Sequence, residues 1–362
     1  MLKTKNIFIN YYNVQNLGDD LFVLLVAKRY PDICFHIAAD RKHQTALLGY
    51  KNIVIHTNKI RDKIISKLTR KVFNQDLLYK GRVKDCDGII FLGGSLFIEP
   101  KNGIEQFYSK RQSLYVSNKP FWVIGANFGP FTCETFYQFH KREFSRYQGV
   151  SFRDLYSYKL FKDLDNVLKA PDVIFGCKKY FKVQIKTRKK TVLFILMKHI
   201  DDKLYFQQIV NLIRQFRHNG YHIKLLAFCV FEGDEKITRR VYREITDLDK
   251  VDMLIYTGKN LLEIIMEIAN AMLIVTMRFH GIVLALTYET PVYPISYSIK
   301  TQNLLEDIDF YGNWVTTDRI IDIRYEDVVQ NIELARNFNP QSLINNSSKQ
   351  FEFFDNFLKR EI

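Results

Sequence analysis

Residues 271–295 read AMLIVTMRFHGIVLALTYETPVYPI, and this stretch decides the fold class. The apolar run at 271–275 predicts a strand that leads directly into the polar junction TMRFHG at 276–281. A second apolar run at 282–286 predicts a buried helix, and residues 292–295 predict the next strand. Strand, helix and strand in this order form a βαβ unit, which is typical of a parallel sheet in an α/β fold.

The same alternation extends over nearly the whole chain, in two sets. The predicted strands lie at residues 7–11, 33–37, 53–56, 88–92, 121–124 and 149–152, and then at 192–196, 223–228, 253–256, 272–275 and 292–295. Between strands of the second set, apolar residues recur at helical spacing and predict helices whose apolar faces join the core. One such stripe consists of Ile209, Leu212, Ile213 and Phe216. We therefore expect two doubly wound, Rossmann-like domains that face a cleft.

A basic segment separates the two sets of strands. Residues 176–190, GCKKYFKVQIKTRKK, carry seven basic side chains and no acidic one, and we expect the domain boundary here. The predicted domains are residues 1–180 and 181–362, the second ending in a terminal helix rich in phenylalanine.

Composition excludes several classes of protein. Hydrophobic residues make up 47% of the 362-residue chain and charged residues 25%, which excludes a disordered protein. The apolar runs are far shorter than the ~20 residues that span a bilayer, and the amino terminus lacks the pattern of a secretory signal, so we expect a cytoplasmic protein. The five cysteines include no CxxC pair and the eight histidines no HExxH pattern, so we expect neither a disulfide framework nor a bound metal.

Positive charge is concentrated in the first half of the chain. The net charge is +14, and residues 1–180 hold 29 basic and 16 acidic side chains against 24 and 23 in residues 181–362. This asymmetry indicates an anionic partner such as nucleic acid, a membrane surface or a phosphorylated substrate, although a solvated basic surface is an equally common reading. Because no helix-turn-helix, zinc finger or RNP pattern is present, we do not expect nucleic-acid binding.

Glycine-rich or polar sequences follow four predicted strands of the first half. They should meet at one rim of the sheet, where glycines let backbone N–H groups approach a ligand. The candidate residues here are Asn16, Gly18, Asp19, Gly93, Gly94, Ser95, Asn127 and Arg153. The alternatives are a capped helix turn at residues 16–19 and a structural ion pair at Arg153.

The strongest single site is the junction at 276–281. Arg278 and His280 lie between a strand and a helix, beside free backbone N–H groups, and together they form a receptor for phosphate or carboxylate. An imidazole there can also move a proton near neutral pH. The alternative is a buried His280 bonded to a carbonyl and an Arg278 held in a structural salt bridge. Tyr297 and Lys300 follow the next strand and should lie on the same rim.

Taken in order, the motifs resemble the polysaccharide pyruvyl transferase family. They are NLGD, FLGGSLF, GANFGP, SFRD, APDVIF, TMRFHGIVLAL and PISYSIK, and they extend from the first strand to Lys300. The resemblance implies a fold similar to GT-B glycosyltransferases, phosphoenolpyruvate as donor and co-substrate with no further cofactor, and a glycan acceptor that receives pyruvate as a ketal. The family's Arg-Leu-His triplet is matched by Arg278, Phe279 and His280, and its Ser-x-Arg-Asp segment by residues 151–154.

The resemblance divides the candidates between the two substrates. The predicted donor-binding residues are Arg153, Arg278, Phe279, Tyr297 and Lys300. The predicted acceptor-binding residues are Asn16, Gly18, Asp19, Gly93, Gly94, Ser95 and Asn127. Arg278 and His280 are the predicted catalytic residues, with the choice between acid and base open at His280. The sequence departs from the family where Ser95 replaces a third glycine and Ser298 an aspartate. Asp172 matches a family aspartate, for which packing or capping is as good a reading as catalysis.

The basic first half suits glycans assembled on a lipid diphosphate. We expect such an acceptor, and peripheral contact with the anionic inner face of the cytoplasmic membrane. Two rival interpretations remain: a GT-B glycosyltransferase that uses a nucleotide sugar, and a catalytically inactive scaffold with the same fold.

Overall fold

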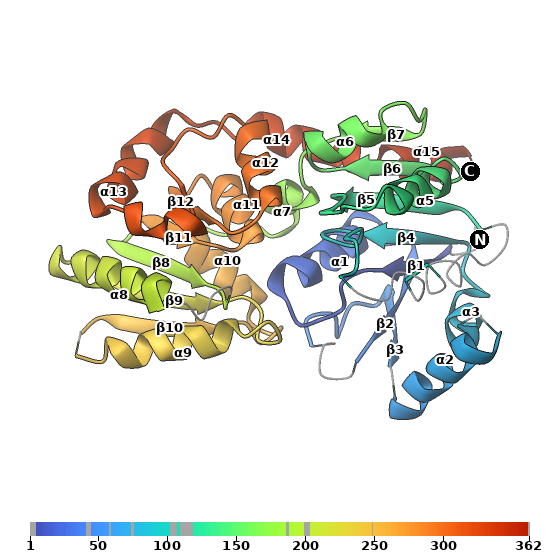
Figure 1. Cartoon of the computed structure of the whole chain (residues 1–362), viewed down its shortest axis with the longest axis horizontal. Coiled ribbons are helices and arrows are strands. Elements are labelled where there is room, and N and C mark those ends of the chain that lie inside the picture. The colour runs from blue at the N-terminus through green and yellow to red at the C-terminus, as the bar shows by residue number, and fades with distance from the viewer. Residues whose placement is uncertain are drawn as a thin grey trace. The chain divides into compact units, whose positions relative to one another are not determined.

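A computed structural model describes residues 5–40, 45–57, 59–73, 76–101, 107–108, 119–185, 188–198, 203–247 and 249–360. The chain divides into two compact units (Figure 1). Unit 1 consists of Met1–Val14, Asp19–Val173 and Ser348–Ile362, and unit 2 of Gln15–Gly18 and Ile174–Ser347.

The sheet of unit 1 is parallel and has the strand order β3-β2-β1-β4-β5-β6-β7. Its strands are β1 (Asn6–Asn10), β2 (Cys34–Ala39), β3 (Ile53–Thr57), β4 (Gly88–Leu92), β5 (Phe121–Ala126), β6 (Gly149–Phe152) and β7 (Val167–Lys169). The strand order reverses between β1 and β4, and this reversal is where doubly wound sheets hold their ligands, outside the carboxyl ends of the strands.

Helices connect these strands. They are α1 (Leu17–Arg29), α2 (Ile60–Phe73), α3 (Leu77–Val83), α5 (Glu134–Phe144), α6 (Leu155–Phe161) and, near the carboxyl terminus, α15 (Glu352–Arg360). A core rich in phenylalanine joins the sheet to α5, with Phe91, Phe97 and Phe144 among its buried members. Burial of each aromatic side chain contributes about 1.5–3 kcal/mol, so this cluster is a main source of stability in unit 1.

Unit 2 repeats the design with the parallel strand order β10-β9-β8-β11-β12-β13. Its strands are β8 (Thr191–Leu196), β9 (His222–Ala227), β10 (Val251–Ile255), β11 (Leu273–Thr276), β12 (Val292–Ser296) and β13 (Val315–Thr316). Here the strand order reverses between β8 and β11, so this sheet also has a rim suited to a ligand.

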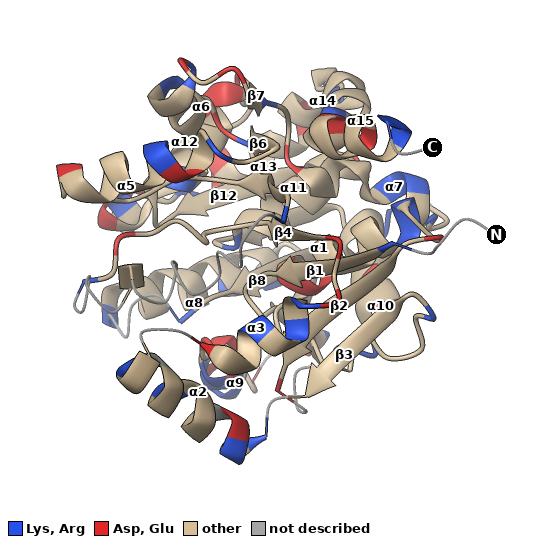
Figure 2. Cartoon of the chain, turned by 90° about the vertical axis from the view of Figure 1, so that its right-hand side faces the viewer, with Lys and Arg blue, Asp and Glu red and all other residues tan. Residues whose placement is uncertain are grey.

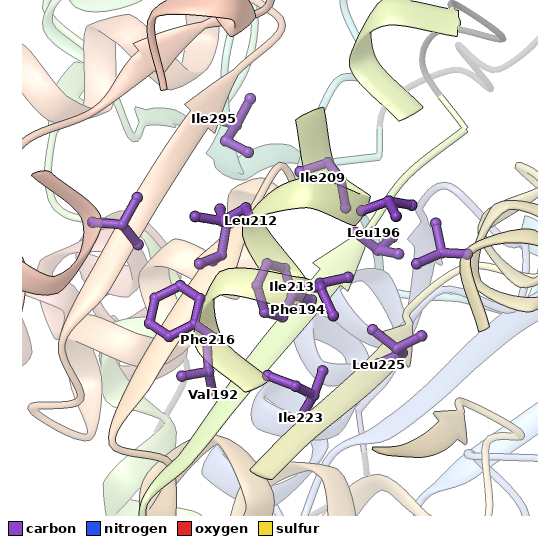
Figure 3. Close-up of a cluster of buried hydrophobic side chains, with 14 of the residues drawn as sticks. Val192, Phe194, Leu196, Ile209, Leu212, Ile213, Phe216, Ile223, Leu225 and Ile295 are labelled. Atoms are coloured by element: carbon purple, nitrogen blue, oxygen red, sulfur yellow. The ribbon is translucent and has the colours of Figure 1, made fainter. Parts of the chain in front are cut away.

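The helices of unit 2 are α7 (Cys177–Tyr180), α8 (Lys203–His218), α9 (Asp234–Glu244), α10 (Leu261–Asn270), α11 (Phe279–Thr287), α12 (Ile299–Asp307), α13 (Tyr325–Leu334) and α14 (Gln341–Asn346). Its 3₁₀ turns are η3 (Thr317–Asp322) and η4 (Ala335–Asn337). The 3₁₀ turns η2 (Val173–Gly176) and η5 (Ser347–Phe351) lie where the chain passes from one unit to the other. The predicted stripe on α8 is buried against β8 and β9, where Ile213 and Phe216 meet Phe194 (Figure 3). The helical spacing of apolar residues therefore identified the core face correctly.

The fold class is confirmed. Every predicted strand is present, with ends shifted by two residues or fewer. The strands β7 and β13 were missed, because three half-buried residues and two residues respectively are too short to produce an alternating pattern. No helix in the described part of the chain is both long and apolar enough to cross a bilayer.

The division of the chain differs from the predicted boundary at 180 in two respects. The chain passes into unit 2 between Val173 and Ile174, and the basic segment 176–190 begins inside that unit, where buried Cys177 lies 3.6 Å from the Tyr288 hydroxyl. The terminal helix was assigned to the second domain, but residues 348–362 belong to unit 1. There Phe354 lies edge-on to Trp122, with ring centroids 5.0 Å apart.

Candidate functional site

The junction between β11 and α11 places Arg278 and His280 at the rim of the unit 2 sheet. Strand β11 ends at Thr276, whose Oγ1 accepts a hydrogen bond of 3.0 Å from the backbone N–H of Arg278. Arg278 keeps an extended backbone as the N-cap residue, and its carbonyl accepts from the N–H of Gly281 at 2.8 Å, which starts the helix. Thus the chain turns from strand to helix within two residues, with the side chains of both candidates at the turn.

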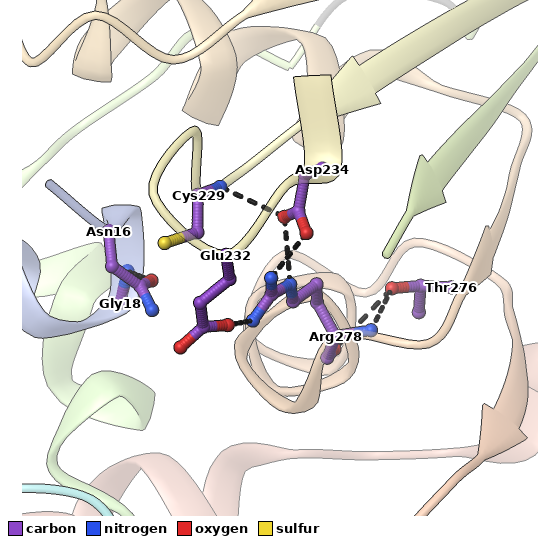
Figure 4. Close-up of polar contacts among 7 residues, drawn as sticks. All are labelled: Asn16, Gly18, Cys229, Glu232, Asp234, Thr276 and Arg278. Atoms are coloured by element: carbon purple, nitrogen blue, oxygen red, sulfur yellow. Dashed lines mark hydrogen bonds and ion pairs between the residues drawn. The ribbon is translucent and has the colours of Figure 1, made fainter. Parts of the chain in front are cut away.

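The guanidinium of Arg278 is held by two carboxylates (Figure 4). Its Nε donates to Asp234 Oδ2 at 2.9 Å, its Nη2 donates to Asp234 Oδ1, and its Nη1 donates to Glu232. Asp234 is fully buried, whereas the Glu232 side chain is 29% exposed. Arg278 therefore sits in an ion-pair network, as the alternative interpretation of the sequence anticipated, with a fork–fork contact on one side and a more accessible partner on the other.

Burial and neighbouring charges shift the pKa values of this network in opposite directions. Desolvation lowers the pKa of Arg278, but the neighbouring charges of Asp234 and Glu232 outweigh it, so the pKa lies above its usual value. Desolvation raises the pKa of Asp234, opposed by the charge and hydrogen bonds of Arg278. Burial also raises the pKa of Cys229 to about 12, so this thiol stays protonated and is no nucleophile.

His280 lies in the first turn of α11 against Gly18. A Cβ built on Gly18 would lie 1.7 Å from Nδ1 of His280, so a side chain larger than glycine cannot fit beside the ring. The Phe279 ring meets the imidazole edge-on, with centroids 5.3 Å apart. These two contacts fix where the imidazole lies.

Residues Gln15–Gly18 belong to unit 2, whereas the predicted first domain contained them; Asp19, the next residue, belongs to unit 1. Leu17 N–H donates to the carbonyl of Phe228 at 3.3 Å, and Asn16 forms an antiparallel bridge with Cys229. Asn16 Oδ1 accepts from Gly18 N–H at 3.1 Å, so the start of α1 is capped within residues 16–19, as the capped-turn interpretation anticipated. Gly18 lies against the imidazole of the predicted catalytic histidine, and its predicted acceptor contact stays a prediction.

Lys300 and Tyr297 follow β12, which is paired in parallel with β11. Both are partly buried, and the Lys300 ammonium lies over the Tyr297 ring, 5.6 Å from its centroid. Because adjacent parallel strands end at the same edge, the prediction that these residues share a rim with Arg278 is confirmed.

Three of the predicted residues of unit 1 meet at the ends of β4, β5 and β6. Arg153 Nη2 donates to Asn127 Oδ1 at 2.7 Å, and Asn127 N–H donates to the carbonyl of Gly94 at 3.3 Å. Gly93 and Gly94 both have positive φ, 76° and 40°, a conformation that L side chains rarely adopt. The shared rim of these motifs is therefore real, although Asn127 Oδ1 is already occupied by Arg153.

Arg153 also forms a buried salt bridge, with Nη1 2.8 Å from Asp172 Oδ2. This contact gives Asp172 a structural partner, in keeping with the packing interpretation. Asp19 lies in the first turn of α1, with its Oδ1 3.6 Å from the position of a Cβ on Gly94, and Ser95 is partly buried. The donor role of Arg153 and the acceptor roles of Asp19 and Ser95 stay predictions.

Glu232 and Asp234, the partners of Arg278, were not among the residues predicted from the sequence. Glu232 lies in the turn between β9 and α9, and Asp234 is the first residue of α9, at the same rim as Arg278. The signal was present, because the polar sequence EGD at 232–234 follows a predicted strand as the other motifs do. Among the described residues, no group of three or more His, Cys, Asp or Glu side chains is arranged to hold a metal ion.

Similar solved structures define the class. The chain is similar over 99% of its length to the UDP-GlcNAc 2-epimerase of Methanocaldococcus jannaschii, covering 100% of that chain with a TM-score of 0.61 and 11% identity. A glycosyltransferase of Rickettsia africae gives a TM-score of 0.53 at 12% identity, covering 100% of this chain and 98% of that one. Anabaena HepE, solved with UDP and glucose, gives 0.55 at 13% identity with 99% of each chain covered. The fold is therefore that of GT-B glycosyltransferases and related epimerases.

Within this class, the sequence itself defines the family. The model of the family described as polysaccharide pyruvyl transferase matches residues 16–299, and the chain belongs to this family. It is 21% identical over 258 residues to the amylovoran biosynthesis protein AmsJ of Erwinia amylovora. That match covers 64% of this chain and 61% of AmsJ, which is less than two thirds of the relative's length.

Proposed function

We propose that the protein transfers pyruvate from phosphoenolpyruvate to two hydroxyls of a sugar in a surface polysaccharide or its lipid-linked precursor, forming a ketal and releasing phosphate. The observation that carries this proposal is the Arg278-Phe279-His280 sequence at the start of α11, within a chain of the polysaccharide pyruvyl transferase family. The family description names a polysaccharide and the relative is named as an amylovoran biosynthesis protein, and both support a glycan acceptor.

Donor binding requires cations, because phosphoenolpyruvate carries a phosphate and a carboxylate. Asp234 holds two nitrogens of Arg278 in a fixed plane, while Nη1 faces the more exposed Glu232. We expect a donor anion to replace Glu232 on Nη1, with Lys300 supplying a second positive charge from the same rim. In this arrangement Asp234 orients the guanidinium and Glu232 keeps it paired until the donor binds.

The chemistry requires one protonation at carbon. A general acid adds a proton to the methylene carbon of the enol, which makes the central carbon an oxocarbenium-like electrophile. One sugar hydroxyl attacks that carbon, the bond to the phosphate oxygen breaks, and a second hydroxyl closes the ketal. Of the two hydroxyl protons, one replaces the proton given to carbon and the other leaves with phosphate. His280 is our candidate for this acid or base.

The acceptor is the less defined substrate. In unit 1, the backbone at Gly93 and Gly94, with Asp19 and Ser95 beside it, forms a polar rim where a sugar could bind through hydrogen bonds. The excess of positive charge in residues 1–180 fits an acceptor carried on a lipid diphosphate at the inner face of the cytoplasmic membrane.

An acceptor-dependent assay tests the proposal. The protein is incubated with phosphoenolpyruvate and a pool of galactosides, mannosides and N-acetylhexosamines, free and lipid-linked, and released phosphate is measured. We expect phosphate only when an acceptor is present, and at least tenfold weaker donor binding for Arg278→Ala, since each lost charge-assisted hydrogen bond is worth about 1.5–3 kcal/mol. Consumption of a nucleotide sugar instead would establish the glycosyltransferase alternative, which the GT-B fold also permits.

A further inference from the structure

Helix α2 exposes its apolar side chains to solvent. Six of them are between 44% and 80% exposed: Ile60, Ile64, Ile65, Leu68, Val72 and Phe73. Residues 60, 64, 68 and 72 recur at intervals of four, so they form one stripe along the helix. In a helix that packs on a protein core, this stripe would be buried. A continuous exposed apolar stripe is instead typical of a surface that contacts a partner protein or a membrane.

The polar face of α2 is the one that attaches the helix to unit 1. Asp62 lies 3.6 Å from Arg82 of α3, and Thr69 Oγ1 accepts from the N–H of Leu77 at 3.4 Å. Ser66 donates to the carboxylate of Asp76, the residue that caps α3. The usual orientation of an amphipathic helix is therefore inverted, because hydrogen bonds and an ion pair hold its polar face to α3 while its apolar stripe is exposed.

The charge of the helix indicates what covers the stripe. The sequence of α2, IRDKIISKLTRKVF, contains five basic residues and one acidic residue, and that acidic residue is paired with Arg82. The exposed side chains of Lys67 and Lys71 lie within one turn of Leu68. Figure 2 shows α2 beside α3 at the periphery, with basic positions along it. A symmetric contact with a second copy of α2 would bring like charges together, which opposes self-association through this face.

We infer that α2 is the element that docks the protein on an anionic lipid surface. Its apolar stripe enters the boundary between headgroups and acyl chains, and the exposed side chains of Lys67 and Lys71 meet the lipid phosphates, as in interfacial amphipathic helices. The inference rests on the membrane contact proposed above and names the surface that makes it. A helix docked in this way would hold the enzyme where a lipid-diphosphate-linked acceptor is found.

Vesicle sedimentation of the full chain tests the inference. Vesicles of phosphatidylcholine with and without phosphatidylglycerol are offered at low and high salt. We expect binding to the anionic vesicles only, weakened by salt because the Debye length shrinks below about 10 Å. Ile64→Ser with Leu68→Ser, and separately Lys67→Glu with Lys71→Glu, should each weaken binding at least tenfold.

A control pair of substitutions tests whether the effect belongs to α2 or follows from replacing any two exposed apolar side chains. Leu262 and Met266 on α10 are 54% and 46% exposed and also four residues apart, so Leu262→Ser with Met266→Ser should change vesicle binding less than twofold. Unchanged binding by the α2 variants, or displacement of the wild type from vesicles by excess DNA, would overturn the inference. So would light scattering that shows a wild-type dimer dissociated by the Ile64 and Leu68 changes without loss of vesicle binding. Phosphate release with a water-soluble acceptor is measured in parallel, so failure of pyruvyl transfer is seen separately from failure of docking.

Discussion

The ring of His280 lies against a position where only glycine fits. We predict that Gly18→Ala lowers turnover at least tenfold, because a Cβ 1.7 Å from Nδ1 must displace the imidazole or the start of α1. The measurement is the rate of acceptor-dependent phosphate release, together with a thermal melt. Gly81→Ala in α3 is the control, since a Cβ there meets nothing within 4 Å, and it should leave activity unchanged and stabilise the helix by about 1 kcal/mol or less. Full activity in Gly18→Ala would mean that the position of His280 does not matter.

Asp234 neutralises a buried arginine. We predict that Asp234→Asn destabilises the protein by about 3–5 kcal/mol, because Arg278 would stay charged without its bidentate partner. Chemical denaturation measures the loss. Glu235→Gln on the same helix removes a pair with Arg239 that is exposed to solvent, and should cost about 0.5 kcal/mol or less. Equal effects of the two substitutions would show that the Arg278 network contributes little to the fold.

At the level of strands and helices, the position of the site was predictable and its electrostatics were not. A polar sequence directly after an apolar strand marks the rim of a parallel sheet, and this rule placed Arg278, Lys300, Asn127 and Arg153 correctly. The pairing of Arg278 with Asp234 joins residues 44 positions apart. No local pattern reports such a contact, because it depends on β9 and β11 lying on either side of β8.

The carboxyl-terminal segment also shows that local sequence patterns do not report long-range contacts. Its closely spaced phenylalanines predicted a helix that packs on the body, and α15 is that helix. Amphipathic spacing says which face is buried but not which unit covers it. Just before α15, buried Gln350 accepts from Gly125 N–H at 2.9 Å and donates to the carbonyls of Phe152 and Ala170. Nothing in the sequence distinguished this glutamine from a surface residue.

Two strands of unit 1 carry a histidine pair that should make stability depend on pH. His36 Nδ1 on β2 lies 3.0 Å from His56 Nε2 on β3, with Asp85, Arg82 and Cys34 the neighbouring groups. Burial lowers the pKa of both below 6.5, and Arg82 and the other imidazole lower that of His56 further. The folded state therefore favours the neutral rings.

We predict that the free energy of unfolding is greatest above about pH 7 and falls as the pH drops through 6.5. In that range the two histidines are protonated in the unfolded chain but stay neutral in the folded chain, because their pKa values are lower in the folded state. The loss should level off once the pH is below the folded pKa values. Denaturation midpoints between pH 8 and 5 measure this, and His56→Gln should flatten the profile whereas His218→Gln, an exposed residue at the end of α8, should not. A profile that His56→Gln leaves as steep as before would contradict the prediction.

At the level of the whole molecule, the fold and the family together limit the possible donors and reactions more than either does alone. The two parallel sheets are shared with enzymes that bind nucleotide sugars, and 9–13% identity to those structures says nothing about the donor. The family match over residues 16–299 includes parts of both units and contains every predicted site residue except Lys300. The donor assignment thus depends on the family and on the chemistry of Arg278 and His280.

The most direct test measures whether the methylene carbon of phosphoenolpyruvate takes up a proton from solvent during the reaction. The protein is supplied with phosphoenolpyruvate and a glycan acceptor in deuterium oxide, and the purified product is analysed by mass spectrometry and NMR. We predict a cyclic ketal on two sugar oxygens whose methyl group carries one deuterium, with one phosphate released per ketal and loss of the product in His280→Ala. A product that gains a sugar from a nucleotide donor, or a ketal methyl without deuterium, would contradict it.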